Sequence, residues 1–443
     1  MKRGFLNSTK GKAAIASTAS SDSSKAPTGH HILQGHNIAN APFGRLDKVQ
    51  VPKGFETDLS MVRRLKDAAE YAKADYLWVN MPEVPWTEEP VTECLFVRGT
   101  REILLETPGF PQRLPPTPSN GPAFRVAPSP GKGLGLFSTR ALKQGEVILT
   151  ERPLLMTPIA VRTTHPQTFS EAESVQHSLN EFERFAQHAV NRMEDESRRK
   201  AFFELQNSHL EDGSGPIVGR IRTNGIGVEG LQPGISGTVG SYSAVCDAIS
   251  RLNHSCSPNT FAKFSRAMFA FALYAVRDIA EGEELTFSYL EMFPPAAERA
   301  KKCLPYAFTC TCRACTPPTQ ESDARRREIL DFNSRSESLC TRWMEDRALP
   351  DDWLIKQYLA QLVRLEKEKL QYCEYYCIAM TALMDCYIAL GDRRRASKWA
   401  ARVKRLTWID YPERYFASLD GLLDPESAAY VKHKMWRTRV GIY

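Results

Sequence analysis

Three cysteines lie within a span of six residues, in the stretch TCTCRAC that contains Cys310, Cys312 and Cys315. Thiolates this close together can hold one face of a tetrahedral zinc ion, and a closed structural site needs a fourth ligand from elsewhere. Cys256, in the stretch RLNHSCSPNTF, is the best candidate, because most other cysteines lie in helical patterns or far upstream and Cys303 lies off the cluster. A chance group of reduced thiols is the alternative, but the type and number of ligands favour zinc.

Composition limits the class of protein to which the chain can belong. Its 443 residues, 42% of them apolar, predict two or three domains. Eleven cysteines without the apolar core of a secretory signal indicate reduced thiols. No apolar run is long enough to span a bilayer, so we expect a soluble protein. We also expect a monomer that resides in the nucleus, the cytoplasm or both. The formal net charge of +6 permits an anionic partner without requiring one, so direct nucleic-acid binding is a minor hypothesis.

The N-terminal part divides at a proline-rich run. Residues 1–40 are basic, small and polar, which predicts a disordered tail, with a transit peptide as the weaker alternative. Residues 41–122 form a region of mixed helix and strand. Helix-forming residues predominate from Ser60 to Val79, and CLFVRGTREILLE, starting at Cys94, is typical of a strand. The run from Pro108 to Pro122 marks the boundary.

Residues 123–300 are rich in short strands and interrupted by a helical insert at about 157–220. Val147, Ile148 and Leu149 indicate a buried strand, and the sequence from Phe261 to Leu290 predicts further strands. Within the insert, apolar residues recur every three or four positions, which indicates one buried helix face. These residues are Phe182, Phe185, Ala186, Ala189, Val190 and Met193.

After the cysteine cluster the chain is helical, from residue 318 to residue 443. Two helical patterns flank Gly391, and YIALGDRRRA resembles part of a tetratricopeptide unit. Cys373, Cys377 and Cys386 lie within these patterns, where we expect core packing and not metal binding. A protein partner for these C-terminal helices is one further expectation.

Three other stretches have both a structural and a chemical interpretation when taken alone. RLNHSCSPNTF has the composition of a surface turn, and GKGLGLF, which starts at Gly131, favours a hairpin turn over a ligand loop. GKGLGLF also lacks the dinucleotide-binding pattern, because Leu136 stands where the third glycine belongs. Tyr289, at the end of GEELTFSYL, is by itself most simply a core residue.

Taken together, these stretches resemble the SET-domain protein lysine methyltransferases. The matching text is GKGLGLFSTRALKQGEVIL, RLNHSCSPN, GEELTFSYL and YAFTCTCRAC, the last as a post-SET zinc module at residues 301–317. The helical C-terminus is similar to that of the SET-and-MYND branch. That branch has a MYND zinc finger after its first strands. Residues 153–245 of this chain contain no cysteine, so the finger is absent. The resemblance implies an α+β fold of short twisted sheets, the SET β-clip, with a helical insert.

The resemblance also assigns residues to a site for S-adenosylmethionine and for a substrate lysine. It implies that the cofactor contacts Lys132, Gly133, Leu134, Asn224, Asn253, His254 and Phe308. Asn224, in an Asn-Gly pair, is equally well explained as an ordinary turn residue. Tyr289 and Tyr306 correspond to the catalytic tyrosines and line the lysine channel with Phe287. A phenylalanine at position 287 favours transfer of more than one methyl group, and zinc bound by Cys256, Cys310, Cys312 and Cys315 would be structural.

The predicted activity is therefore protein-lysine N-methylation of a histone or another protein. A catalytically inactive SET-fold scaffold that binds partners is the rival, since a fold does not prove turnover. A zinc-dependent hydrolase is a poor fit, because ligation by four sulfurs leaves no position for a catalytic water.

Overall fold

The computed structural model describes residues 50–56, 59, 63–64, 76–83, 88–116, 119, 121–159, 161, 163, 168–231, 242–409 and 418–441. The predicted tail at residues 1–40 lies outside this part of the chain. So does most of the stretch from Ser60 to Val79, in which we expected a helix.

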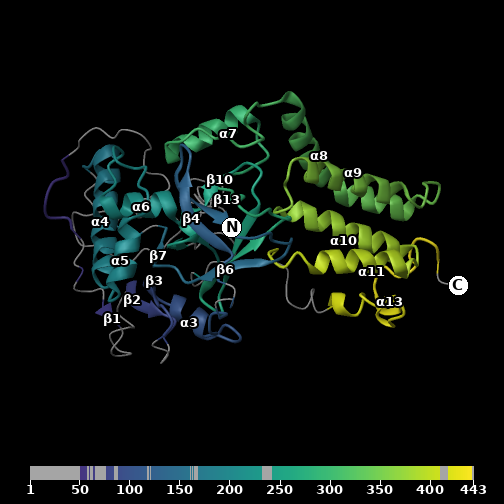
Figure 1. Cartoon of the computed structure of the whole chain (residues 1–443), viewed down its shortest axis with the longest axis horizontal. Coiled ribbons are helices and arrows are strands. Elements are labelled where there is room, and N and C mark those ends of the chain that lie inside the picture. The colour runs from purple at the N-terminus through teal and green to yellow at the C-terminus, as the bar shows by residue number, and fades with distance from the viewer. Residues whose placement is uncertain are drawn as a thin grey trace.

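Within the described residues, the strands form three sheets that lie between two groups of helices (Figure 1). The six-stranded sheet has the order β1 (Arg63–Arg64), β2 (Tyr76–Met81), β3 (Thr92–Val97), β7 (Leu155–Pro158), β9 (Tyr242–Val245) and β8 (Ile226–Val228). The four-stranded sheet has the order β10 (Asn253–His254), β13 (Glu284–Phe287), β5 (Gly133–Ser138) and β4 (Phe124–Ser129). The third sheet has the order β11 (Thr260–Ser265), β12 (Ala270–Ala275) and β6 (Val147–Glu151). Short sheets combined with helices give the expected α+β fold.

The six-stranded sheet separates two apolar cores, and this explains why one predicted helix ends as a strand. On β2, Leu77 and Val79 belong to the core shared with the other sheets, whereas Trp78 enters the core beneath the helical insert. Alternation between two cores requires a period of two, which a helix cannot supply. The prediction of a helix from Ser60 to Val79 is therefore wrong for its end, Tyr76–Val79, which is part of β2.

The prediction of a strand in CLFVRGTREILLE is correct for its first four residues alone. The strand expected from Cys94 is present as β3, but it ends at Val97, and Thr100–Leu105 forms helix α3. Gly99 lies between them with φ of 93°, a backbone conformation that glycine adopts without strain and that lets the chain turn from strand into helix.

The helical insert consists of three helices that cover one face of the six-stranded sheet. They are α4 (Glu171–Asn191), α5 (Glu196–Phe203) and α6 (Pro216–Asn224). A capping box fixes the start of α4, because Ser170 accepts from the N–H of Glu173 while the Glu173 carboxylate accepts from the N–H of Ser170. The apolar stripe predicted from Phe182 to Met193 is buried, as expected.

The glycine-rich stretch GKGLGLF begins in the turn of a hairpin between β4 and β5, which its composition favoured, and continues into β5 from Gly133. Gly133 has φ of 77°, and a Cβ on Gly135 would lie 2.8 Å from Nδ2 of Asn253. Glycine at 135 thus lets the hairpin approach β10 closely. The strand predicted at residues 147–149 is β6, but it is only half-buried, because Val147 is 45% exposed at the edge of its sheet.

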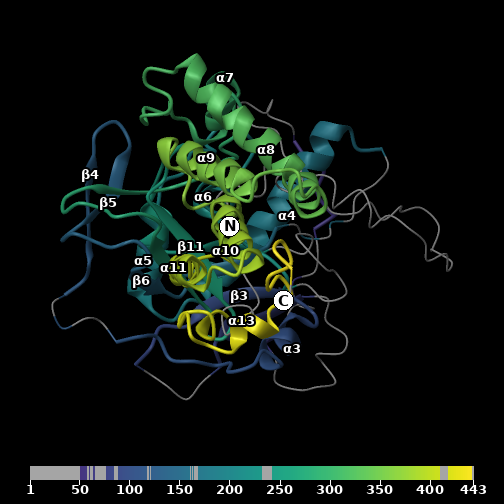
Figure 2. The same ribbon diagram turned by 90° about the vertical axis from the view of Figure 1, so that its right-hand side faces the viewer.

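The C-terminal helices stack side by side and face the viewer in Figure 2. They are α8 (Gln320–Glu345), α9 (Trp353–Lys367), α10 (Glu374–Ala389), α11 (Arg393–Lys404) and α13 (Ala429–Lys432). Gly391, with φ of 76°, allows the turn between α10 and α11. Cys377 and Cys386 are buried in this block and Cys373 lies at its edge, which agrees with core packing. None of the helices in the described part of the chain is long and apolar enough to cross a bilayer.

Candidate active site and zinc centre

Two chain segments that are far apart in the sequence run side by side and form the floor of the site. Strand β10 pairs in parallel with β13, so that His254 lies opposite Phe287. Beyond the strand pair, the N–H of Ser255 donates to the carbonyl of Phe287 at 3.0 Å, and the N–H of Tyr289 donates to Nδ1 of His254 at 3.1 Å. The NHSC stretch is therefore not a surface turn, because it is threaded beside an inner strand and hydrogen-bonded along it.

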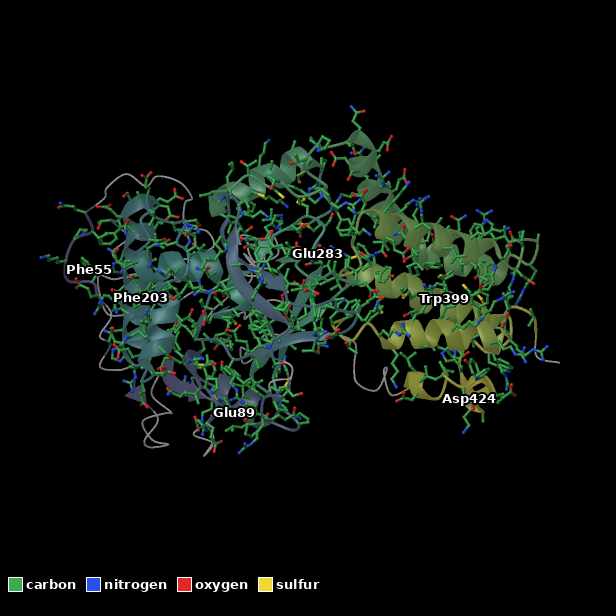
Figure 3. All side chains as sticks on the ribbon, in the orientation of Figure 1. Phe55, Glu89, Phe203, Glu283, Trp399 and Asp424 are labelled. Carbon is green, nitrogen blue, oxygen red and sulfur yellow. The ribbon has the colours of Figure 1, made fainter. Side chains whose placement is uncertain are left out.

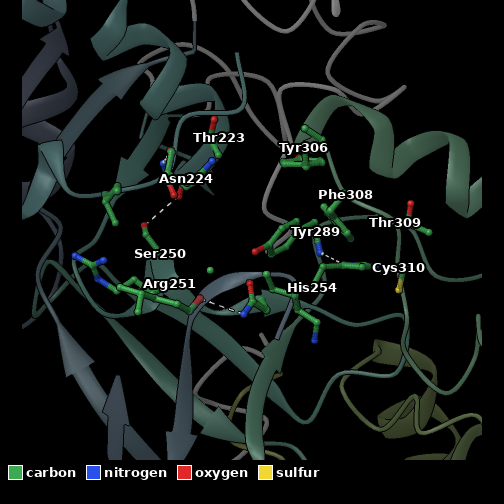
Figure 4. Close-up of a pocket in the computed structure, with 18 of the residues that line it drawn as sticks. Thr223, Asn224, Ser250, Arg251, His254, Tyr289, Tyr306, Phe308, Thr309 and Cys310 are labelled. Atoms are coloured by element: carbon green, nitrogen blue, oxygen red, sulfur yellow. Dashed lines mark hydrogen bonds between the residues drawn. The ribbon is translucent and has the colours of Figure 1, made fainter. Parts of the chain in front are cut away.

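A cavity of about 440 Å³ opens above this floor. Its lining comes from the β4–β5 hairpin, the end of α6 and the segment around β10. The last part of the lining begins at the end of the 3₁₀ helix η5 (Leu304–Tyr306), which follows α7 (Ala296–Cys303). Figure 4 shows Asn224 and Ser250 on one side of the cavity, with His254, Tyr289, Tyr306 and Phe308 on the other. Its volume falls in the range of about 300–1,000 Å³ that is usual for small-molecule sites.

One wall of the cavity is aromatic. The ring centroid of Tyr289 lies 5.1 Å from that of Tyr306, 5.2 Å from that of His254 and 6.0 Å from that of Phe308. The hydroxyl of Tyr289 donates its hydrogen to the carbonyl of Leu252 at 2.6 Å. Its oxygen therefore offers lone pairs and no further proton to a group placed in the cavity.

His254 connects this wall to the cysteines. Because Nδ1 accepts from the backbone, the neutral ring has its proton on Nε2, which lies 3.3 Å from Sγ of Cys256. Burial lowers the pKa of His254 to about 4. The imidazole thus donates a hydrogen bond to sulfur while it forms part of the cavity floor.

The four predicted metal ligands lie together, although the fourth comes from another segment of the chain. The sulfurs of Cys256, Cys310, Cys312 and Cys315 all lie within 4.8 Å of one another. Sγ of Cys256 is 3.9 Å from that of Cys310 and 3.5 Å from that of Cys315. Zinc–sulfur bonds of about 2.3 Å in a tetrahedron place the sulfurs about 3.8 Å apart, so the donor set fits zinc.

A family model for the SET domain matches residues 133–290, which include β5, the helical insert, β10 and β13. This match covers 158 of the 443 residues.

Curated relatives of the chain are named as lysine methyltransferases. Histone-lysine N-methyltransferase set5 of Schizosaccharomyces pombe is 24% identical over 280 residues, which are 63% of this chain and 76% of that protein. Histone-lysine N-methyltransferase SMYD3 of Homo sapiens is 32% identical over 170 residues, 37% of this chain and 38% of the relative. N-lysine methyltransferase SMYD2 of Rattus norvegicus is 26% identical over 193 residues, 42% of each chain. The match therefore spans less than half the length of the last two relatives.

The structure brings nearly all predicted site residues into the same cavity. Those that line it are Lys132, Gly133, Leu134, Asn224, Asn253, His254, Tyr289, Tyr306 and Phe308. Phe287 does not line it, since its side chain is 2% exposed and packs in the core behind β13. Its role in a lysine channel stays a prediction.

Asn224 is the residue for which two interpretations were open, and it is not a surface turn residue. It ends α6 and is 2% exposed. Its Nδ2 donates to the carbonyls of Gln206 at 2.6 Å and Arg220 at 2.9 Å, and its carbonyl accepts from Ser250. These bonds fix the side chain at the rim of the cavity.

Sequence reasoning missed Glu284, which orients two predicted cofactor residues from β13. Its carboxylate accepts from Nδ2 of Asn253 at 2.8 Å and from Nζ of Lys132 at 3.0 Å, and from Oγ of Ser129. Burial opposes ionisation of Glu284, but these hydrogen bonds outweigh it and lower the pKa of the carboxyl. Its position before the conspicuous Tyr289 in GEELTFSY was the available signal.

Arg299, on α7, was also missed. It is fully buried beside the cysteine cluster, where its Nη2 donates to the carbonyl of Ala314 at 3.0 Å and lies 3.7 Å from Sγ of Cys315. Four thiolates around one divalent zinc would carry net negative charge, which this buried guanidinium would offset. The spacing of residues along the chain gave no signal for Arg299, because only the folding of α7 against the cysteine cluster brings its side chain there.

Proposed function

We propose that this protein transfers a methyl group from S-adenosylmethionine to the side-chain amine of a lysine in a protein substrate. The observation that supports this proposal best is a single cavity that brings three groups together. It is lined by Lys132 of the β4–β5 hairpin, by Asn253 and His254 of β10, and by the aromatic wall. The naming of three relatives as lysine methyltransferases supports the same reaction. A histone is one candidate substrate, and a non-histone protein is the other.

The residues of the cavity fit the cofactor. Lys132 supplies a cation and Asn253 an amide, both held by Glu284, while Phe308 offers an apolar face. When bound, the cofactor supplies an activated methyl group on a positively charged sulfur. The chain must hold that group in line with the incoming amine, and such positioning can contribute about 7–11 kcal/mol to catalysis.

The aromatic wall is suited to the protonation problem of the substrate. Free lysine has a pKa near about 10.4, so it enters as an ammonium at neutral pH. A wall formed by Tyr289, Tyr306 and Phe308 disfavours the charged form by desolvation. The Tyr289 oxygen, which already donates to Leu252, can accept a hydrogen bond from the amine and so orients it.

Zinc would be held by Cys256, Cys310, Cys312 and Cys315 and would have a structural role. With four sulfur ligands it has no open position for water, so it takes no part in the reaction. It would fix the segment at residues 306–315 over the cavity. The proposal includes transfer of more than one methyl group, which rests on the resemblance at Phe287 and not on the lining of the cavity.

The test compares wild type with Tyr289→Phe in the presence of labelled S-adenosylmethionine and cell lysate. We expect labelled protein from the wild type and a rate about a hundredfold lower from the variant, at similar cofactor affinity, because the hydroxyl acts on the amine. Mass spectrometry of the product counts the methyl groups.

Tyr430→Phe is the matched control, because the Tyr430 hydroxyl also donates to a backbone carbonyl, that of Leu422, at 2.5 Å, far from the cavity. It should keep full activity. A wild-type protein that binds the cofactor but labels nothing would instead support the inactive scaffold.

A further inference from the structure

Positive charge is concentrated on one helix of the C-terminal block. The segment Arg393–Arg405, which contains α11, has seven Lys and Arg residues and no acidic residue. The whole chain has a formal net charge of +6, so the remainder of the protein is slightly acidic. The modest overall value therefore hides a strongly basic surface.

Four of these cations form a row on the solvent-facing side of α11. The helix packs inward through Ala396, Ala400 and Val403, which are fully buried. Four cations, spaced by four, four and three residues, lie on the opposite face of the helix and are exposed. They are Arg394, Lys398, Arg402 and Arg405, here called the cationic stripe. With a rise of 1.5 Å per residue, the stripe extends over about 16 Å.

Carboxylates of the described residues pair with neighbouring cations and leave the stripe free. Arg395 pairs with Asp392 at 3.4 Å, and Lys404 pairs with Asp420. In the part of the chain that the structure describes, no carboxylate lies within 4 Å of a charged nitrogen of the stripe. Arg402 lies over the ring of Trp399 at 4.6 Å, and Figure 3 labels Trp399 in this helical block. Stacking holds the guanidinium in place while its N–H edge stays available.

We propose that the cationic stripe binds the phosphate backbone of a nucleic-acid duplex. Each one-turn step along the stripe, about 6 Å, corresponds to about two base pairs of duplex at 3.4 Å each. Three of the four residues are arginines, which bind phosphate through two N–H groups. This revises the expectation from net charge alone, which made nucleic-acid binding a minor hypothesis.

A duplex suits the stripe better than an acidic peptide does. Protein interfaces rely on buried aromatic or aliphatic anchors, but none of the large exposed apolar side chains of the described residues lies on α11. A binding face built from charge alone is typical of contact with phosphates, which position a protein without reading base sequence. The inference does not depend on the proposed methyl transfer.

The test measures binding of fluorescent 20-base-pair DNA and RNA duplexes to the full chain by anisotropy, at 50–200 mM KCl and without methyl donor. Four phosphate contacts predict that wild-type affinity falls by roughly a hundredfold over this range. The variant R394Q/K398Q/R402Q/R405Q should bind at least tenfold more weakly at 50 mM, with a salt slope shallower by about 3–4. The duplex that binds with the higher affinity, DNA or RNA, identifies the source of the phosphates.

The control variant R327Q/R335Q/K356Q/K367Q removes the same charge from exposed positions on α8 and α9. It should bind as the wild type does, and thermal melting should show that both variants are folded. Absence of duplex binding by the wild type, or equal loss in both variants, would overturn the proposal. Displacement of the duplex by a poly-glutamate peptide at equal charge concentration would also overturn it.

Discussion

At the scale of single residues, the cavity depends on groups that do not line it. Glu284 holds Asn253 and Lys132 through charge-assisted hydrogen bonds, and it lies behind both residues. Such bonds are worth more than neutral ones, so loss of the charge affects two cavity residues together. Glu284 is therefore a positioning residue.

We predict that Glu284→Gln removes an acid-sensitive part of the stability. The pKa of Glu284 is lower in the folded chain than its unfolded value near about 4.3, so its ionised form stabilises the fold above that pH. This contribution is lost as the pH falls through the folded pKa. The difference in unfolding free energy between wild type and variant should stay constant from pH 7 to 5 and shrink below about pH 4.3.

Urea unfolding at each pH measures this difference. Release of zinc in acid affects both proteins, so their difference is the quantity to compare. Glu281→Gln, at an exposed position in the same turn, is the control for the loss of one carboxylate from this part of the chain. A difference that grows toward low pH would contradict the assigned direction of the pKa shift.

At the scale of helices and strands, a buried ion pair joins the C-terminal helices to the zinc-binding segment. Arg326, on α8, is fully buried, and its Nε donates to the carboxylate of Glu368 at 3.0 Å. Its Nη2 donates to the carbonyl of Cys256 at 3.1 Å. The carbonyl of Glu368 in turn accepts from Ser257 at 2.8 Å. One residue after the end of α9 thus holds the stretch that supplies both His254 and a predicted zinc ligand.

We predict that Arg326→Met lowers the free energy of unfolding by about 1–3 kcal/mol, because it leaves the buried carbonyl of Cys256 without this donor. The Glu368 carboxylate loses one of its partners but keeps Arg325 and Ser322. Combining it with Glu368→Met should cost less than the sum of the two single changes. Denaturant unfolding measures both effects.

The exposed pair Lys356–Asp352 provides the comparison, and Lys356→Met should cost no more than about 1 kcal/mol. Additive single and double variants at positions 326 and 368 would show that the pair does not act as a unit.

The sequence predicted helices and strands well where one periodic pattern matched burial on one face of the element. The stripe of α4 and the hairpin at Gly133 are such cases. The cavity residues were assigned through a resemblance to a known family, which several short motifs carry together. Strand β2 was missed because burial on both faces decides its conformation, and residue composition there favoured a helix. Arg299 and Arg326 were missed because a buried cation is defined by partners from other segments of the chain.

At the scale of the whole molecule, the C-terminal helices and the zinc centre share one core. Cys256, Cys303 and Cys310 belong to the same buried cluster as Trp343, on α8, and Leu383, on α10. The division of the chain at residue 317, which follows the sequence patterns, therefore does not separate two independent cores.

We predict that removal of residues 318–443 exposes this core, so that the shortened chain aggregates and loses cofactor binding. Size-exclusion chromatography and calorimetric titration with S-adenosylmethionine measure the two effects. Removal of residues 1–40 is the matched control and should change neither. A monomeric shortened chain with wild-type cofactor affinity would show that the SET domain folds without the helices.

The bond between the Glu368 carbonyl and Ser257 also sets an order of events during translation. The ribosome delivers the SET segments long before residue 368 leaves the exit tunnel. Until then, the loop that bears His254 lacks one of its anchors. Premature termination before residue 368 therefore releases a product in which this hydrogen bond to the loop is missing.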